Sequence, residues 1–81
     1  MYKNKAEDGT NNIIGIRVRE IRENMPKKVS QRQLAELLQV VGLDVDKNAI
    51  QRIESGQRFV TDIELKAIAK VLNVDYSQLL D

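Results

Sequence analysis

Apolar residues recur three or four positions apart along most of the chain, a spacing typical of amphipathic helices. The first stripe contains four residues: Ile14, Val18, Ile21 and Met25. It predicts a helix over residues 13–24, which Asn11 or Asn12 can cap. Pro26 ends this helix, because a proline disfavours helical geometry in the residue before it.

A second helix is expected to begin after Ser30, since Gln33 three residues later completes a capping box. Its predicted buried stripe is Leu34, Leu37, Leu38 and Val41, with Ala35 beside it. Gly42 is the natural end of this helix, because glycine readily adopts the left-handed conformation found there.

A third helix is expected over residues 47–55, between a cap at Asp46 and a stop at Gly56. Three apolar residues face inward: Ala49, Ile50 and Ile53. The outward positions are polar: Lys47, Asn48, Gln51, Arg52 and Ser55.

The last part of the chain predicts two more helices. Thr61 and Glu64 form a capping box that opens a helix over residues 62–72. Its expected buried face is Leu65, Ile68, Ala69 and Leu72. Asp75 can cap a short final helix over residues 76–80. No segment alternates with period two over enough length to predict a strand, so we expect an all-α domain of five short helices.

Length and composition narrow the class of protein. The 81 residues suit one domain, with residues 1–11 as a flexible N-terminal tail and residues 12–81 as the folded part. The sequence has no cysteine or histidine, which excludes disulfides, thiolate or imidazole metal sites and Ser-His-Asp catalysis. We therefore expect no metal, no cofactor and no enzymatic activity. The chain also lacks a long apolar run, so we expect a cytoplasmic protein without membrane contact.

Cationic residues are unevenly distributed, although the net charge is only +1. Residues 14–34 contain six cationic and two acidic side chains, and residues 47–58 contain three and one. Two basic segments could form one face for nucleic acid. Ordinary solvated helix surface has the same charge pattern, so charge alone does not decide.

The outer side of the third predicted helix is more specific. A helix that reads DNA needs apolar anchors on one side and long hydrogen-bonding side chains near its N-terminus on the other. Four residues meet this need and are predicted to contact bases: Lys47, Asn48, Gln51 and Arg52. Asn and Gln can bind adenine with two hydrogen bonds, and Arg or Lys can bind guanine.

Two further residues have a physical role beyond helix formation. Glu54 would lie beside apolar residues at the negative end of the third helix, where it needs a cationic partner. Gln31 lies in the first turn of the second helix, where its side chain and the backbone N–H groups can face a phosphate. Ordinary polarity at a helix start explains Gln31 equally well.

Four segments, in this order, resemble the Cro/repressor-type helix-turn-helix family, also called xenobiotic-response-element-like: "IGIRVREIRE", "SQRQLAELL", "IQRIESGQR" and "LKAIAKVLNVDYSQLL". The resemblance covers residues 13–81. It implies a five-helix lambda-repressor-like fold with the third helix in the major groove. It also implies a bacterial or phage transcriptional regulator, a repressor in our interpretation, that binds double-stranded DNA as a homodimer on a two-fold symmetric operator.

The resemblance also implies roles for individual residues. Arg22 is expected to pair with Glu54, and Gln31 to contact the DNA backbone. We expect phosphate contacts from four residues: Ser30, Gln31, Gln57 and Arg58. The last helix offers Tyr76, Leu79 and Leu80 for a modest self-interface, although at least one leucine is expected to close the monomer's own core.

The connection between the two motif helices departs from the family pattern. A turn of about three residues is usual, and residues 39–46 contain about five more than this pattern allows. We expect a longer second helix and a turn at residues 42–44. Leu43 and Val45 are expected to fill the added space. The depth at which the third helix enters the groove is therefore left open.

Two other classes of protein are alternatives to a DNA-binding regulator. An enzyme is disfavoured, because Glu54-Ser55-Gly56 is a helix end and not a nucleophile elbow. A protein-interaction helical bundle is compatible with five amphipathic helices, but the third helix has no large apolar anchor on its outer side. A mixed role stays open, in which the last helix binds a protein partner, as in antitoxins.

Overall fold

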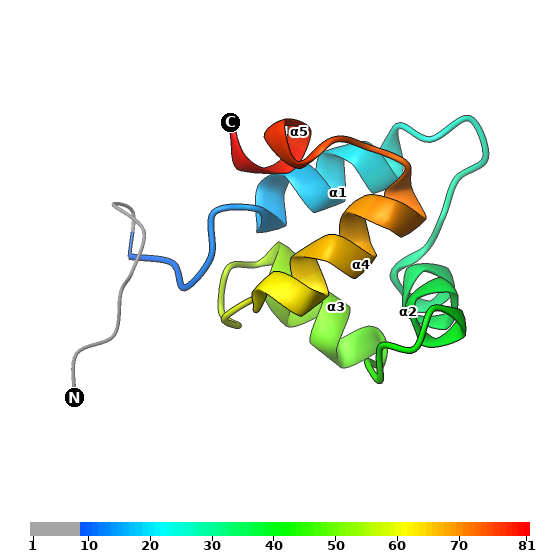
Figure 1. The fold of residues 1–81 in the computed structure, drawn as a ribbon, viewed down its shortest axis with the longest axis horizontal. Coiled ribbons are helices and arrows are strands. Elements are labelled where there is room, and N and C mark those ends of the chain that lie inside the picture. The colour runs from blue at the N-terminus through cyan, green and yellow to red at the C-terminus, as the bar shows by residue number, and fades with distance from the viewer. Residues whose placement is uncertain (1–8) are drawn as a thin grey trace.

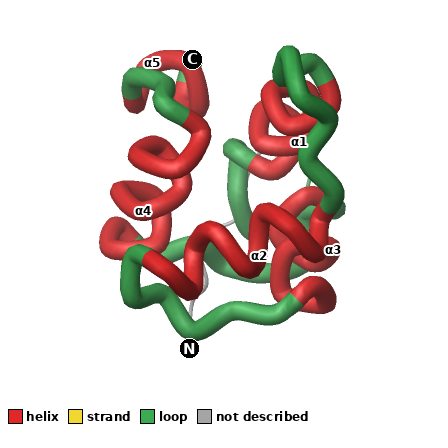
Figure 2. Tube along the Cα trace, turned by 90° about the vertical axis from the view of Figure 1, so that its right-hand side faces the viewer, coloured by secondary structure: helices red, strands yellow, loops and turns green. Residues whose placement is uncertain are grey.

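A computed structural model describes residues 9–81, which form five α-helices and no strand. They are α1 (Gly15–Glu23), α2 (Gln31–Val40), α3 (Lys47–Glu54), α4 (Asp62–Leu72) and α5 (Tyr76–Leu80). In Figure 1, α4 runs between α1 and α3, and α5 lies beside α1. Figure 2 shows α2 crossing one end of the molecule. The predicted all-α class is confirmed, and none of the described helices is long and apolar enough to cross a membrane.

Capping side chains determine where the helices begin. Ser30, Asp46 and Thr61 each accept the backbone N–H of the residue three positions later. Asn12 acts in the same way for α1, since its Oδ1 accepts the N–H of Gly15 at 2.8 Å. The caps predicted for α2, α3 and α4 are confirmed. α1 begins two residues later than predicted, so Ile14 occupies its cap position and Asn12 bonds to the first N–H of the helix from the residues before it.

The core is aliphatic and joins all five helices. Its largest fully buried side chains are Leu34, Leu38, Ile50, Ile53, Ile68, Leu79 and Val18. The prediction for α2 was wrong at Leu37 and Val41, which are exposed. Ala35 completes the buried face in place of Leu37, which lies on the other side of Leu34 because each residue advances about 100° around a helix. Val41 lies beyond the end of α2.

The connection between α2 and α3, residues 41–46, has a defined structure. Gly42 adopts the left-handed conformation, with φ at 95°. This allows the N–H of Leu43 to reach the carbonyl of Leu38 at 3.0 Å, in a Schellman arrangement. Val45 is buried and Leu43 packs partly against the core, so the prediction that they fill the added space is confirmed. Gln39 also donates its amide N–H to the carbonyl of Val45 at 2.7 Å.

The chain before α1 contacts the far end of α3. Of the predicted tail, residues 1–8 lie outside the described residues. The backbone N–H of Asn11 donates to the carbonyl of Gly56 at 2.8 Å, just beyond α3. Segments far apart in the sequence therefore meet beside the start of α1.

Candidate nucleic-acid interface

One side of α3 is apolar and buried, and the other is polar and exposed. Ile50 and Ile53 are enclosed in the core. The exposed side, called here the outer arc, consists of Lys47, Asn48, Gln51 and Arg52. Residues four apart lie on the same face of a helix, so Lys47 neighbours Gln51 and Asn48 neighbours Arg52.

The outer arc has no partner within residues 9–81. None of its four side chains makes a hydrogen bond or an ion pair with any of those residues. Two amides and two cations are thus available to an external ligand. These are the groups that bind base edges in the major groove of DNA.

The residues expected to contact phosphates are mostly engaged inside the protein. The hydroxyl of Ser30 caps α2. Gln31 donates its amide N–H to Glu54 at 3.0 Å, and Arg58 donates to Glu64 at 2.7 Å. Gln57 is exposed, and its side chain has no hydrogen bond among the described residues.

Arg22 and Glu54, the pair expected from the sequence, lie together as a buried ion pair. Arg22 Nε lies 2.7 Å from Glu54 Oε2, and Arg22 Nη2 lies 2.9 Å from Oε1. Their side chains are only 12% and 3% exposed. The hydrogen bond to Glu54 raises the pKa of Arg22 above its ordinary value, despite an opposing effect of burial. The guanidinium of Arg22 therefore remains charged at any working pH.

Gln31 extends this pair into a network that joins three helices. Its amide contacts the same carboxylate oxygen, Glu54 Oε1, that accepts from Arg22 Nη2. Arg22 Nη1 also donates to the carbonyl of Val29 at 3.0 Å, just before α2. The last residue of α3 is thus bound to both α1 and the start of α2. This contact of Gln31 was not predicted from the sequence, because no periodic pattern links the start of α2 to the end of α3.

A second ion pair, between Arg58 and Glu64, connects the turn after α3 to the start of α4. The hydrogen bond to Glu64 raises the pKa of Arg58. Burial acts to raise the pKa of Glu64, but hydrogen bonds from Arg58 and Thr61 outweigh it, and the pKa lies below its ordinary value. The sequence analysis missed this pair because the two residues are six apart across a turn.

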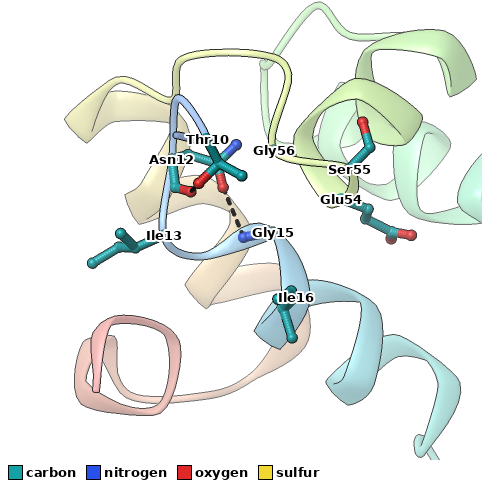
Figure 3. Close-up of a pocket in the computed structure, with 8 residues that line it drawn as sticks. All are labelled: Thr10, Asn12, Ile13, Gly15, Ile16, Glu54, Ser55 and Gly56. Atoms are coloured by element: carbon teal, nitrogen blue, oxygen red, sulfur yellow. Dashed lines mark hydrogen bonds between the residues drawn. The ribbon is translucent and has the colours of Figure 1, made fainter. Parts of the chain in front are cut away.

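The side chains of Asn11 and Asn12 make further contacts that were not predicted, with the end of α3 and the turn after it. Asn11 Nδ2 donates to the carbonyl of Gln57 at 2.8 Å. Asn12 Nδ2 donates to the carbonyls of Ile53 at 3.1 Å and Arg58 at 2.7 Å. Figure 3 shows this region, with Thr10 and Asn12 beside Gly56. Only the cap on α1 could be expected from the local sequence.

Comparison with known proteins identifies the class. The sequence profile of the helix-turn-helix family matches residues 18–79, a span that includes α2, α3 and α4 completely. No curated protein and no solved structure gives a significant match. The chain belongs to the helix-turn-helix family, and its five helices have the lambda-repressor-like arrangement. It is a DNA-binding transcriptional regulator of a family that is regulatory and not catalytic.

Proposed function

We propose that the chain is a sequence-specific repressor of the Cro/repressor type, and that α3 reads the major groove of double-stranded DNA. The observation that supports this most directly is the outer arc, four polar side chains without a partner in residues 9–81. Ile50 and Ile53 anchor the opposite side of α3 in the core, so the helix can present the outer arc to DNA without losing core contacts.

The residues of the outer arc have different proposed roles. Asn48 can bind adenine with two hydrogen bonds, and Arg52 on the same face can bind guanine. Lys47 and Gln51 flank them and contact neighbouring bases. Of the four proposed base contacts, that of Lys47 depends most on the orientation of α3, which the long connection before the helix affects. A small rotation of the helix would direct Lys47 to a phosphate.

Ser30, Gln31, Gln57 and Arg58 are the proposed phosphate contacts. Arg58 has five N–H donors, so its bond to Glu64 leaves others for a phosphate. Replacing Arg58 with Ala should weaken binding to all sequences about equally. The slope of log affinity against log salt should become shallower by about one unit.

Selection of binding sites from random double-stranded DNA tests the proposal. We expect an enriched site with two-fold symmetry, whose affinity falls steeply as salt rises because binding releases counterions. A scrambled site of equal base composition is the control. The absence of any enriched sequence, or enrichment without salt dependence, would contradict groove reading.

We also propose that the chain binds its operator as a homodimer through α4 and α5. The two helices border an open hollow of about 370 Å³. The apolar residues that line it are Ile63, Leu65, Tyr76 and Leu80. Sedimentation equilibrium should give a dimer that Tyr76→Lys dissociates, whereas Val40→Lys, an exposed position on α2, should not. A monomer in both free and DNA-bound states would instead favour an antitoxin-like role with a different partner.

Repression and location complete the proposal. A dimer bound across a promoter excludes other proteins from it, so a reporter with the selected site at its promoter should lose expression when the chain is produced. We propose the cytoplasm of a bacterium, or of a cell infected by a phage, as the place of action. A rise in reporter expression would indicate an activator.

A further inference from the structure

The start of α1 packs directly against the backbone at the end of α3. Position 15 requires glycine, because a Cβ atom there would collide with the carbonyl oxygen of Ile53. Gly56 follows α3 with φ at 80°, and a Cβ there would collide with Thr10. The two backbones are therefore in close contact at Gly15 and Ile53, and one of the side chains at this junction bonds to both of them (Figure 3).

That side chain is Asn12, and both ends of its amide are used. Its Oδ1 accepts the N–H of Gly15 at 2.8 Å, in the first turn of α1. Its Nδ2 donates to Ile53 in the last turn of α3, 41 residues later, and to Arg58 after the turn. The three contacts are called here the Asn12 clamp. They join α1 to α3 independently of the Arg22–Glu54 pair.

We propose that Asn12 is a positioning residue for DNA recognition, because its clamp fixes the direction of α3 relative to α1. This inference rests on the proposed function of the outer arc. The network around Glu54 holds the end of α3 through one side chain, and Ile50 and Ile53 hold the helix through apolar packing, which constrains its direction less strictly than hydrogen bonds to the backbone do. The Asn12 clamp attaches the backbone directly at Ile53, within α3, and at Arg58. The bonds of Asn11 reach only the turn after the helix, so the clamp is the hydrogen bond from this segment that acts on α3 itself.

The geometry of a short helix makes this effect large at the DNA. α3 has eight residues, so its N-terminal end lies about 10 Å from the clamp at a rise of 1.5 Å per residue. A small rotation at the clamp therefore displaces Lys47 and Asn48, which begin the helix. Base contacts depend on direction more strictly than phosphate contacts do, so a misdirected helix should lose specificity before it loses general affinity.

Two substitutions of Asn12 separate its bonds to Ile53 and Arg58 from its bond to the start of α1. Asn12→Ser and Asn12→Asp both keep an oxygen that can accept the N–H of Gly15. Both remove the amide that donates to Ile53 and Arg58, and Asp also places a negative charge against two carbonyls. The matched controls are Asn24→Ser and Asn24→Asp. The Asn24 amide donates to the carbonyl of Glu20 within α1, so it makes the same kind of bond without reaching α3.

The first measurement is the ratio of affinities for the selected site and for random DNA at one salt concentration. We expect Asn12→Asp to lower this ratio about tenfold, comparable to one mismatched base pair, and Asn12→Ser to lower it less. Both Asn24 variants should keep the parent ratio. If the Asn12 variants melt at lower temperature but keep the parent ratio, Asn12 only stabilises the fold and the inference is wrong.

A second measurement does not depend on DNA. Residual dipolar couplings of the backbone amides report the orientation of α3 relative to α1 and α4. We expect a changed orientation of α3 in Asn12→Ser, the milder variant, and the parent orientation in Asn24→Ser. An unchanged orientation of α3 in Asn12→Ser overturns the inference. This result does not depend on whether the parent prefers a DNA site, so it is distinct from a failure of the proposed function.

Discussion

The two ends of α3 differ in how they are bound to the rest of the protein. At the N-terminal end, Lys47 and Asn48 are exposed and their side chains have no partner among residues 9–81. At the C-terminal end, the carboxylate of Glu54 accepts three hydrogen bonds from two side chains. The carbonyl of Ile53 accepts a further one from Asn12.

This difference suggests that one end of α3 stabilises the fold and the other recognises DNA. Buried hydrogen-bond networks are costly to disrupt, whereas exposed side chains contribute little to stability. Substitutions at the C-terminal end of α3 should therefore act mainly on the free energy of unfolding. Substitutions at the N-terminal end should act mainly on DNA affinity, with little effect on folding.

The largest expected effect is on the buried pair. Arg22→Met leaves the charge of Glu54 buried without its main partner, and should lower the free energy of unfolding by about 3–5 kcal/mol. Glu54→Met should have a similar effect. The double variant should lose less than the sum of the two, because it leaves no stranded charge. Urea denaturation at neutral pH measures all three.

The matched control is an exposed pair of the same residue types. Arg32 and Glu36 lie 3.6 Å apart on α2, with side chains 81% and 63% exposed. Truncating either should cost about 0.2–1 kcal/mol. Additive losses at Arg22 and Glu54 would show that the buried pair contributes no coupling, and the contrast between the ends of α3 would lose its main basis.

The next expected effect is in the core beneath the outer arc. Ile53→Ala should lower the free energy of unfolding by about 2–5 kcal/mol, because it leaves a cavity among buried side chains. Val40→Ala, on the exposed side of α2, should change it by less than about 0.5 kcal/mol. Thermal denaturation followed by circular dichroism compares the two. An unchanged melting temperature for Ile53→Ala would mean that the buried face of α3 is misassigned.

Local patterns predicted much of the fold because helix caps and helical periodicity act within a few residues. Ser30, Asp46 and Thr61 begin helices as expected, and the inward face of α3 is buried. The error at Leu37 arose because periodicity gives an apolar stripe but not its centre, which depends on the neighbouring helices. Leu38 lies at that centre, with Leu34 and Ala35 on its two sides, and Leu37 falls outside it.

The site was predictable only in part, for a related reason. The outer arc follows from one helix, so its four residues could be listed from the sequence. The expected burial of the Glu54 carboxylate predicted a cationic partner, and the family resemblance identified Arg22 as that partner. The bonds of Asn12 to α3 and of Gln31 to Glu54 join segments whose proximity exists only in the folded chain.

A smaller effect is expected on the outer arc of α3, and it concerns DNA affinity. Asn48→Ala or Arg52→Ala should weaken binding to the selected site by about 1–3 kcal/mol and relax the preference at a few base pairs. Their free energies of unfolding should stay within about 0.5 kcal/mol of the parent. Lys70→Ala, an exposed cation on α4, controls for lost charge. If Arg58→Ala alters base preference and these two do not, the proposed docking is wrong.

The smallest expected effect is a dependence on acid pH at the turn after α3. The pKa of Glu64 lies below 4.5 in the folded state, so its charge contributes stability above the unfolded pKa. That contribution is lost as pH falls through the folded value. Glu64→Gln should keep the capping box with Thr61 but remove the charge that pairs with Arg58.

We expect Glu64→Gln to be less stable than the parent by about 1 kcal/mol at pH 7, since the paired side chains are 31% and 12% exposed. The difference should shrink toward zero as pH falls below 4.5, because the parent then loses the same charge. Glu36→Gln, at an exposed carboxylate of an ion pair, is the matched control, and it should differ from the parent at pH 7 by less than Glu64→Gln does. A difference between Glu64→Gln and the parent that stays constant down to the acid transition would mean that the charge of Glu64 does not stabilise the turn. The hydrogen bonds that hold the C-terminal end of α3 would then be those of Glu54, Asn11 and Asn12.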